Sequence, residues 1–447
     1  RLAEHGLLDQ VALHEIDLHT RFELGPFDMQ LVTLTHSIPE PNGVIIRTPV
    51  GTVLHTGDWK IDPEPLIGAS TDVAALEAAG EEGVMAMVCD STNVFTEGES
   101  GSESDVRDNL IELVGKQTGR VAIAAFASNV ARLETAVRAG EANGRRVCLV
   151  GRSMHRMTQA AKAVGLLADC QPFIEEEEIG YFPPDKILLL CTGSQGEPRA
   201  ALSRIAEGSH RNVTLNKGDS VIFSSRIIPG NERGIFDLMN RLAERGVDII
   251  TERDEHIHVS GHPCRDELRQ MYAWAKPTTA IPVHGEYRHL VEHAQLARDL
   301  QVPNAVVPRN GSIIRITQDG ASIVDEAPAG RLHVDGNFLT EADAESIKER
   351  RRLAYNGHLT VAAVLADGEL VSEIDVRAMG VASTHAYDLD DFLDDLAEAA
   401  DTAFKRLDRR ARKDPGAVEE AIRRGVRREA SRIWGKKPHV EAIILTV

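Results

Sequence analysis

Hydrophobic and polar positions repeat in one order through the middle of the chain. An apolar strand, a turn of small residues and an amphipathic helix follow one another in GVMAMVCDSTN, RVAIAAFASNVARLETAV, RRVCLVGRSMHRMTQAA, KILLLCTGSQGEPRAALSRIA and DSVIFSSRIIPGNERGIFDLMNRLAERG. A sixth copy of this pattern is TAIPVHGEYRHLVEHAQLA. Strands that are apolar almost throughout and alternate with helices are typical of a parallel sheet covered on both faces. The pattern therefore predicts an α/β protein.

The two ends of the chain follow other patterns. FDMQLVTLTHSIP, NGVIIRTPVG and TVLHTGDWKID predict three strands of a meander, because proline and glycine turns separate them. We expect a helix in RLAEHGLLDQ at the start and a strand and turn in HEIDLH. Towards the end we expect a linker in AGRLHVDGNF, two strands in HLTVAAVLADGELVSEIDV, two charged helices over 388–435 and a final strand in HVEAIILTV. The basic run KRLDRRARK is interpreted as a solvated helix face.

Polar turns follow most of the predicted parallel strands. In a parallel sheet the ligand binds at the carboxyl ends of the strands. Turns that are distant in the sequence are therefore expected to line one cleft. These turns are Asp90-Ser91-Thr92, Ser128-Asn129, Ser194-Gln195-Gly196, Ser224-Ser225 and His284-Gly285.

Composition limits the class of protein. A chain of 447 residues is too long for one hydrophobic core, so two or three domains are expected. No apolar run reaches membrane-spanning length. The net charge of −19 repels polyanions at long range but allows a local basic channel or bound metal cations. The five cysteines include no C-x-x-C pair, which argues against a disulfide framework and a thiolate zinc site and indicates a reducing cytoplasm.

Histidine and aspartate at strand ends provide the candidate chemistry. His36 lies in THSIP, Asp58 in HTGDWKID and His284 in PVHGE. Imidazole and carboxylate groups are ligands of zinc and manganese, and a carboxylate can bridge the two ions of a two-metal hydrolase. Each residue also has a structural interpretation: His36 could be a buried histidine bonded to the backbone, Asp58 could cap a turn, and Asp90 could cap a helix. The histidines of HVSGH could simply pack on their neighbours.

The ordered set THSIP, HTGDWKID, CDSTN, GSQGEP, SSRIIPGNE, HVSGH and PVHGE resembles ribonuclease J, a family in the β-CASP branch of the metallo-β-lactamase superfamily. The resemblance covers nearly the whole chain. It implies a metallo-β-lactamase αββα sandwich, an inserted doubly wound β-CASP domain and a small α+β C-terminal domain. The implied boundaries are 1–101 and 255–326 for the metallo-β-lactamase domain, 102–254 for the β-CASP domain, 327–350 for a linker and 351–447 for the C-terminal domain.

The resemblance also implies roles for individual residues. His36, Asp58 and His284 would be ligands of two zinc ions, with manganese or magnesium as substitutes. Asp58 and His262 would be catalytic, Asp58 by bridging the ions and His262 by stabilising or protonating the leaving oxygen. The implied substrate contacts are Ala127, Ser128, Asn129, His258, Val259, Ser260, Gly261 and His262. The weaker candidates are Asp90, Ser194, Ser224 and Ser225, and a structural calcium ion is expected near Asp335.

The implied activity is cytoplasmic RNA maturation, including that of ribosomal RNA, and RNA decay. It comprises endonucleolytic cleavage and 5′–3′ degradation of single-stranded RNA from a 5′-monophosphate end. The implied partners are a second copy of the chain, as a homodimer or homotetramer formed through the C-terminal domain, and other RNA-decay proteins, but no membrane.

The sequence departs from the superfamily in one respect: the signature H-x-H-x-D-H is absent. We expect these residues to follow an N-terminal segment that carries the motif, and the 447 residues alone to bind zinc poorly. The alternative is a non-catalytic RNA-binding or scaffold subunit on the same fold. A small-molecule hydrolase such as a thioesterase is disfavoured by the long run of βα units. A Rossmann dehydrogenase is disfavoured because no G-x-G-x-x-G follows a strand.

Overall fold

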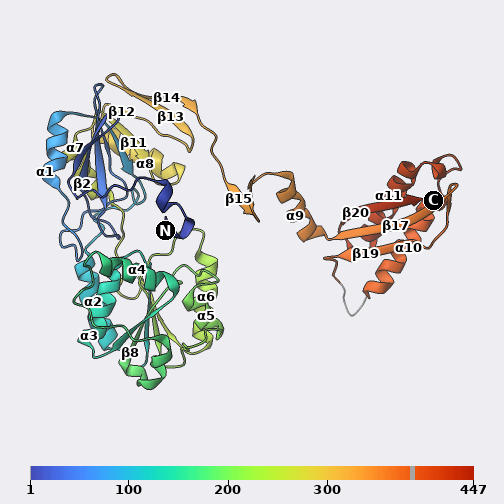
Figure 1. Cartoon of the computed structure of the whole chain (residues 1–447), viewed down its shortest axis with the longest axis horizontal. Helices are drawn as coiled ribbons and strands as arrows, with labels where there is room; N and C mark the ends of the chain where they lie inside the picture. The colour runs from blue at the N-terminus through green and yellow to red at the C-terminus, as the bar shows by residue number, and fades with distance from the viewer. Residues whose placement is uncertain (1, 383–387) are drawn as a thin grey trace. The chain divides into compact units, whose positions relative to one another are not determined.

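The computed structural model describes residues 2–382 and 388–447. Its internal contacts divide the chain into two compact units, Arg1–Ala327 (unit 1) and Pro328–Val447 (unit 2). Figure 1 shows sheets and helices in both units, which confirms the α/β class. Over the described residues, no helix combines the length and the apolar character needed to cross a membrane.

The first sheet of unit 1 has seven strands in the order β1-β2-β3-β4-β5-β11-β12. These are β1 Arg21–Leu24, β2 Phe27–Thr33, β3 Asn42–Arg47, β4 Thr52–His55, β5 Val84–Asp90, β11 Thr279–Val283 and β12 Asn304–Ala305. The predicted meander forms β2, β3 and β4, which pair antiparallel, and β5 then pairs in parallel with both β4 and β11. After forming the second sheet of unit 1, the chain returns to the first sheet and completes it with β11 and β12.

Helices and a hairpin flank this first sheet. Apolar residues of α1 Val73–Glu82, α7 Arg265–Ala275 and α8 Tyr287–Asp299 share one core with β2 to β5. The hairpin β13 Ser312–Thr317 and β14 Gly320–Glu326 lies against β5. The hairpin is thus a second β-layer over part of the seven-stranded sheet.

The second sheet of unit 1 is parallel throughout, in the order β10-β9-β6-β8-β7. Its strands are β6 Val121–Ala124, β7 Arg146–Val150, β8 Ile187–Cys191, β9 Ser220–Phe223 and β10 Asp248–Ile250. Its main helices are α2 Glu103–Gly115, α3 Val130–Ala142, α4 Arg152–Ala163, α5 Ala201–Glu207 and α6 Glu232–Glu244. Val121 and Ile123 of the central strand pack with α2 and α3, whereas Ala122 and Ala124 pack with α5 and α6. Helices therefore cover both faces, and the predicted doubly wound arrangement is confirmed.

Unit 2 contains a four-stranded sheet, a separate hairpin and three helices longer than one turn. The strands are β17 His358–Ala366, β18 Glu369–Leu370, β19 Asp375–Met379 and β20 His439–Thr446, and the hairpin is β15 Leu332–Asp335 and β16 Phe338–Glu341. The helices are α9 Glu345–Asn356, α10 Leu389–Lys405 and α11 Pro415–Trp434. Leu359, Val361 and Leu365 of β17 are buried with apolar residues of α10 and α11, so these helices cover one face of the sheet.

Several local predictions were wrong. Residues 1–10 contain the 3₁₀ turns Ala3–His5 and Leu8–Gln10 instead of a helix, because Gly6 between them has a left-handed backbone with φ of 64°. The segment HEIDLH has its turn but no strand. The expected linker after residue 328 contains the hairpin β15–β16, and the short strand β18 lies between the two strands expected over 358–376.

The basic run 405–413 is also not a helix face. Helix α10 ends at Lys405, and the remainder of the run forms a turn and the 3₁₀ segment Ala411–Lys413. The guanidinium of Arg412 lies over the ring of Phe404, with its carbon 5.1 Å from the ring centre, and it donates to the Lys405 carbonyl. Arg412 therefore caps the end of α10 instead of facing solvent along it.

Candidate metal centre

Four strands of the seven-stranded sheet end at the same edge. Strand β2 runs in the same direction as β4 because β3 is antiparallel to both, and β5 and β11 are parallel to β4. His36 follows β2, Asp58 follows β4, Asp90 is the last residue of β5, and His284 follows β11. The topology therefore brings together four side chains that are distant in the sequence.

A cluster of potential metal ligands forms at this edge. Asp58, Asp90, His262 and His284 each offer a ligand atom, and these atoms all lie within 4.8 Å of one another. Nε2 of His284 lies 3.5 Å from Oδ2 of Asp58. His262 comes from the loop between β10 and α7, and its ring stacks on that of His284 with 5.2 Å between ring centres. Two carboxylates and two imidazoles at this spacing fit a zinc or manganese ion.

Asp90 orients both imidazoles of the cluster. Its buried carboxylate accepts a hydrogen bond from Nδ1 of His262 at 2.7 Å and lies 3.4 Å from Nδ1 of His284. Burial alone would raise the pKa of Asp90, but the hydrogen bonds from His262, His284 and Thr92 outweigh it and hold the pKa well below its usual range. A carboxylate at Nδ1 leaves Nε2 free to face a metal, which is a common arrangement around metal-binding histidines.

Asp90 does not begin a helix, so the helix-cap interpretation was wrong. The residue ends β5, and residues 92–95 form a turn. Its Oδ1 accepts hydrogen bonds from the backbone N–H and the hydroxyl of Thr92, at 2.8 and 2.7 Å. Asp90 thus caps a turn and orients histidines at the same time.

His284 has an unusual backbone. Its φ is 57°, in the left-handed region that residues other than glycine seldom adopt. The hydroxyl of Thr92 holds the residue through Nδ1 at 2.9 Å and through the His284 carbonyl at 3.0 Å. Strain of this kind is concentrated at functional sites, and here it turns the imidazole toward Asp58.

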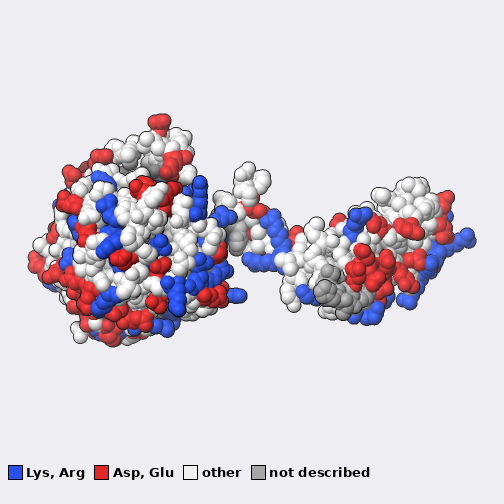
Figure 2. Space-filling model, turned by 90° about the horizontal axis from the view of Figure 1, so that it is seen from below, with Lys and Arg blue, Asp and Glu red and all other residues white. Residues whose placement is uncertain are grey.

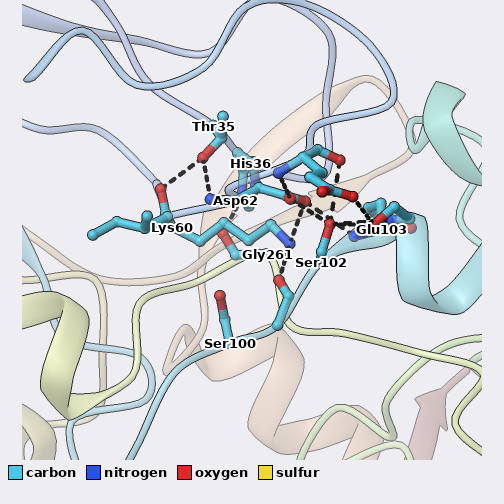
Figure 3. A network of polar contacts seen from close by, with 12 residues as sticks. Thr35, His36, Lys60, Asp62, Ser100, Ser102, Glu103 and Gly261 are labelled. Carbon is cyan, nitrogen blue, oxygen red and sulfur yellow. Dashed lines mark hydrogen bonds and ion pairs between the residues drawn. The ribbon is translucent and has the colours of Figure 1, made fainter.

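His36 lies beside the cluster but outside the four-residue group. Its Nδ1 donates to the carbonyl of Gly261, and its ring centre is 5.0 Å from that of His262. Burial lowers the pKa of His36, so the imidazole is neutral and Nε2 carries the lone pair. A Cβ at position 261 would lie 2.6 Å from Cε1 of His36 and 2.6 Å from Oγ of Ser37, so only glycine fits there. Figure 3 shows this contact between His36 and Gly261.

The HVSGH turn, residues 258–262, is held in place by the side chain of Asn93. Asn93 donates to Oγ of Ser260 at 2.7 Å and to the carbonyl of His262 at 2.9 Å. The side chain of Val259 is buried in the core, and burial lowers the pKa of His258 to about 3. Of the side chains in this turn, that of His262 therefore reaches the cluster directly.

A buried polar network connects the loops of the two sheets (Figure 3). Lys60 lies in the loop after β4. Its Nζ is 3.0 Å from Oδ2 of Asp62 and donates to the carbonyl of Gly101. Asp62 accepts from the hydroxyl of Ser102 at 2.6 Å and from the backbone N–H of Glu103 at 3.0 Å. The loop that carries Asp58 is thereby fixed to the first turn of α2.

The network continues through an ion pair that is almost fully buried. Arg132 of α3 has no exposed surface, and its guanidinium donates to Oε2 of Glu103 at 2.8 Å. It also donates to the carbonyls of Ser224 and Ile257, at 3.0 and 2.9 Å. Ile257 immediately precedes the HVSGH turn. Arg132 thus ties the five-stranded sheet to the loop that carries His262.

Asn129, one of the expected substrate contacts, and the three serines among the weaker candidates have structural roles. Asn129 is buried, caps α3 through the backbone N–H of Arg132 and donates to Glu103. Ser194, Ser224 and Ser225 are buried, and the hydroxyl of Ser224 donates to the carbonyl of Ile257. Ala127 is partly exposed and Ser128 is exposed. In the FASN turn, the surface available to a substrate therefore belongs to Phe126, Ala127 and Ser128.

Asp335, where a calcium ion was expected, is engaged by a side chain. Both of its carboxylate oxygens accept from the guanidinium of Arg350, at 2.9 and 2.8 Å. This pairing satisfies the carboxylate without a cation.

Comparisons with known proteins agree with this geometry. Family models match residues 118–242 (ribonuclease J, beta-CASP domain), 246–308 (Zn-dependent metallo-hydrolase RNA specificity domain) and 345–447 (ribonuclease J C-terminal domain). The ribonuclease J of Sinorhizobium meliloti is 45% identical over 96% of this chain and 76% of its own length. The chain belongs to the ribonuclease J family. The ribonuclease J of Corynebacterium glutamicum is 37% identical over 97% of this chain and 60% of its own length.

Family membership confirms three predictions. The fold is that of the metallo-β-lactamase and β-CASP domains, the protein is a metal-dependent ribonuclease, and its substrate is RNA. The donor set at the strand edge fits the metal cofactor that a ribonuclease J requires. The inclusion of Asp90 and His262 among the potential metal ligands was not anticipated.

Proposed function

We propose that this ribonuclease J family member hydrolyses RNA phosphodiester bonds by a two-zinc mechanism. The observation that carries the proposal is the convergence of Asp58, Asp90, His262 and His284, with the Nδ1 atoms of both histidines turned toward Asp90. Manganese or magnesium could replace zinc. When bound, the cations would stabilise the negative charge of the phosphoryl oxygens and activate a water molecule.

Each residue of the cluster has a proposed task. His36, Asp58 and His284 would hold the metal ions, with Asp58 shared between them. Asp90 positions the imidazoles and fixes the proton on Nδ1 of His262. His262 would act through Nε2, either stabilising the leaving oxygen or giving it a proton. A histidine whose second nitrogen is held by a carboxylate has its other nitrogen oriented for proton transfer.

The loops beside the cluster would bind the RNA backbone. The turn His258–His262 would contact a phosphate through its main chain, because the side chains of Val259 and Ser260 are engaged within the protein. The surface at Ala127 and Ser128 would contact a neighbouring nucleotide. Figure 2 shows blue groups of lysine and arginine among the red acidic residues of unit 1. The net negative charge is thus unevenly distributed, which allows local contacts with a polyanion.

The remaining features of the proposal follow the family resemblance. The chain would cut RNA endonucleolytically and also degrade single-stranded RNA from a 5′-monophosphate end, in RNA maturation and decay. It would act in the cytoplasm as a homodimer or homotetramer formed through unit 2, together with other RNA-decay proteins. The five cysteines are free, as expected of a reducing compartment.

One observation favours a second candidate function. The motif H-x-H-x-D-H does not occur in these 447 residues, so a non-catalytic RNA-binding or scaffold subunit is the alternative. The two candidates differ in the consequence of losing a metal ligand. A scaffold would bind RNA equally well without one, whereas an enzyme would lose cleavage.

The test compares Asp58→Ala and His284→Ala with a control, His155→Ala on helix α4. RNA carrying a 5′-monophosphate or a 5′-triphosphate is the substrate, and zinc content is measured by mass spectrometry. We expect both cluster variants to lose cleavage by at least about 100-fold and to retain less zinc, while the control is unchanged. Wild-type turnover by either cluster variant would refute the catalytic assignment. RNA binding by the folded full-length wild-type protein without zinc or cleavage would favour the scaffold.

A further inference from the structure

We propose that unit 2 contains a second metal site, formed by His358, His439 and Glu441, for a divalent transition-metal ion such as zinc or copper. The site lies in the four-stranded sheet of unit 2, at the beginning of β17 and β20. It shares no residue with the metal centre of unit 1 and does not depend on the proposed function.

Strand pairing places the three side chains on one face of the sheet. β17 and β20 are parallel, His358 is opposite His439, and Thr360 is opposite Glu441. Since side chains two residues apart in a strand lie on the same face, Glu441 is on the same side as the two histidines. The backbone N–H of His439 donates to the carbonyl of Gly357 at 3.1 Å, which fixes the register at this end.

This face is the one that the helices leave uncovered. Leu359 and Val440, the next residues of the two strands, are buried in the core with α10 and α11, so His358 and His439 point the other way. The side chain of His358 is 25% exposed and that of Glu441 is 60% exposed. An ion in solution can therefore reach both residues.

The spacing of the imidazole nitrogens suits a chelated ion. The two Nδ1 atoms lie 3.2 Å apart, and the rings are stacked with 5.3 Å between their centres. Zinc binds imidazole nitrogen at about 2.0–2.1 Å, so two nitrogens on one tetrahedral ion are about 3.4 Å apart. The Nδ1 lone pairs lie in nearly parallel ring planes, so both rings would have to turn for the lone pairs to meet at one ion. Imidazole is a favourable ligand for zinc, copper and nickel.

Glu441 supplies the third ligand. Its Oε2 lies 3.7 Å from Nε2 of His358, on the far edge of that ring, so the carboxylate must rotate to reach an ion held by the two Nδ1 atoms. Its exposure leaves room for that rotation. The paired strands hold the histidines together before the ion arrives, so binding by the second imidazole is effectively intramolecular.

The test counts zinc ions bound by the full chain in equilibrium dialysis, with mass spectrometry as the readout. His439→Ala should bind one zinc ion fewer, or bind it at least about tenfold more weakly, because the chelate is lost. The matched control is His333→Ala, which removes a partly exposed histidine from the hairpin of the same unit. Far-UV circular dichroism checks the fold of each variant, and Glu441→Gln should give a smaller loss than His439→Ala.

Two comparisons make the outcome decisive. In the full-length protein Asp58→Ala should lose zinc from unit 1 only, so a loss in His439→Ala without a loss in Asp58→Ala would support this site and contradict the proposed function. Electron paramagnetic resonance of Cu²⁺ bound to the Asp58→Ala variant should show coupling to two nitrogens. Adding His439→Ala to that variant should abolish the signal of the unit 2 site. Unchanged zinc number and affinity in His439→Ala would overturn the proposal.

Discussion

Replacing Arg132 with methionine tests the network that joins the two sheets of unit 1. Arg132 has no exposed surface, and Glu103, its partner, is only 3% exposed. Methionine keeps much of the apolar stem of arginine but removes a guanidinium that donates to Glu103, Ser224 and Ile257. The substitution therefore leaves the packing nearly intact and isolates the loss of the charge and its hydrogen bonds.

The groups left behind determine the size of the effect. The Glu103 carboxylate would keep only its contact with the amide of Asn129 at 3.2 Å, whereas the Ile257 carbonyl would still accept from the hydroxyl of Ser224 at 2.7 Å. Breaking a buried ion pair by removing one partner costs about 3–5 kcal/mol. Without Arg132, burial would raise the pKa of Glu103, and uptake of a proton would relieve part of this cost. We therefore expect a loss of about 3 kcal/mol at neutral pH.

Urea unfolding followed by tryptophan fluorescence measures this loss. In a Trp434→Phe background the two remaining tryptophans, Trp59 and Trp274, both lie in unit 1 and report its unfolding alone. The matched control is Arg138→Met, on the same helix, whose 34%-exposed guanidinium pairs with the partly exposed Glu134 and Glu141. Ion pairs that water can reach contribute at most about 1 kcal/mol, so the control should shift the midpoint much less. Equal shifts in the two variants would show that the buried pair has no special weight.

Three further predictions concern the site and its surroundings. Gly261→Ala should reduce zinc binding and RNA cleavage at least about tenfold, because the new Cβ would displace His36. Gly180 has open space around it, so Gly180→Ala should change neither measurement. Burial alone would raise the pKa of Glu103, but Arg132 outweighs it and holds the pKa below its ordinary value of 4.5. The stability that the Glu103 carboxylate contributes is therefore present above pH 4.5 and is lost as the pH falls through the folded-state pKa. Glu103→Gln should flatten the decline of the urea midpoint between about pH 6 and 3. Zinc at 100 times its dissociation constant should stabilise unit 1 by about 2.7 kcal/mol against urea. Asp58→Ala should gain less, and an equal gain in that variant would contradict Asp58 as a zinc ligand.

The parallel core of unit 1 was predictable because burial left a strong signal in the sequence. Strand β8 is fully buried along its length and reads ILLLC, which no half-exposed strand would carry. The hairpin β15–β16 was missed for the opposite reason. Val334 and Phe338 are each 78% exposed, so no burial pattern marks these strands. The Asp335-Gly336 pair, a common hairpin turn, was the available signal and was interpreted as part of a linker.

The metal centre was predictable only where the chemistry is visible in a residue type. His36, Asp58 and His284 were proposed because strand-end imidazoles and carboxylates suit metals and because the ordered motifs around them resemble ribonuclease J. Glu103 and Arg132 were not, since charged residues on amphipathic helices are usually solvated. A signal for Arg132 existed: Ala136 and Ala139, one and two turns further along the same helix face, are apolar, and a charge on a buried face must find a buried partner. Its partner lies on another helix, however, and sequence spacing does not reveal that pairing.

The buried network is better explained by its position than by stability. A buried ion pair offers little advantage over apolar side chains of the same volume, because desolvation offsets most of the attraction. No apolar side chain could replace its geometry, however. The guanidinium of Arg132 reaches a carboxylate on α2, a carbonyl after β9 and the carbonyl of Ile257 at once. Through Ile257 it sets the start of the turn that delivers His262 to Asp90, so the five-stranded sheet contributes to the metal centre without supplying a ligand.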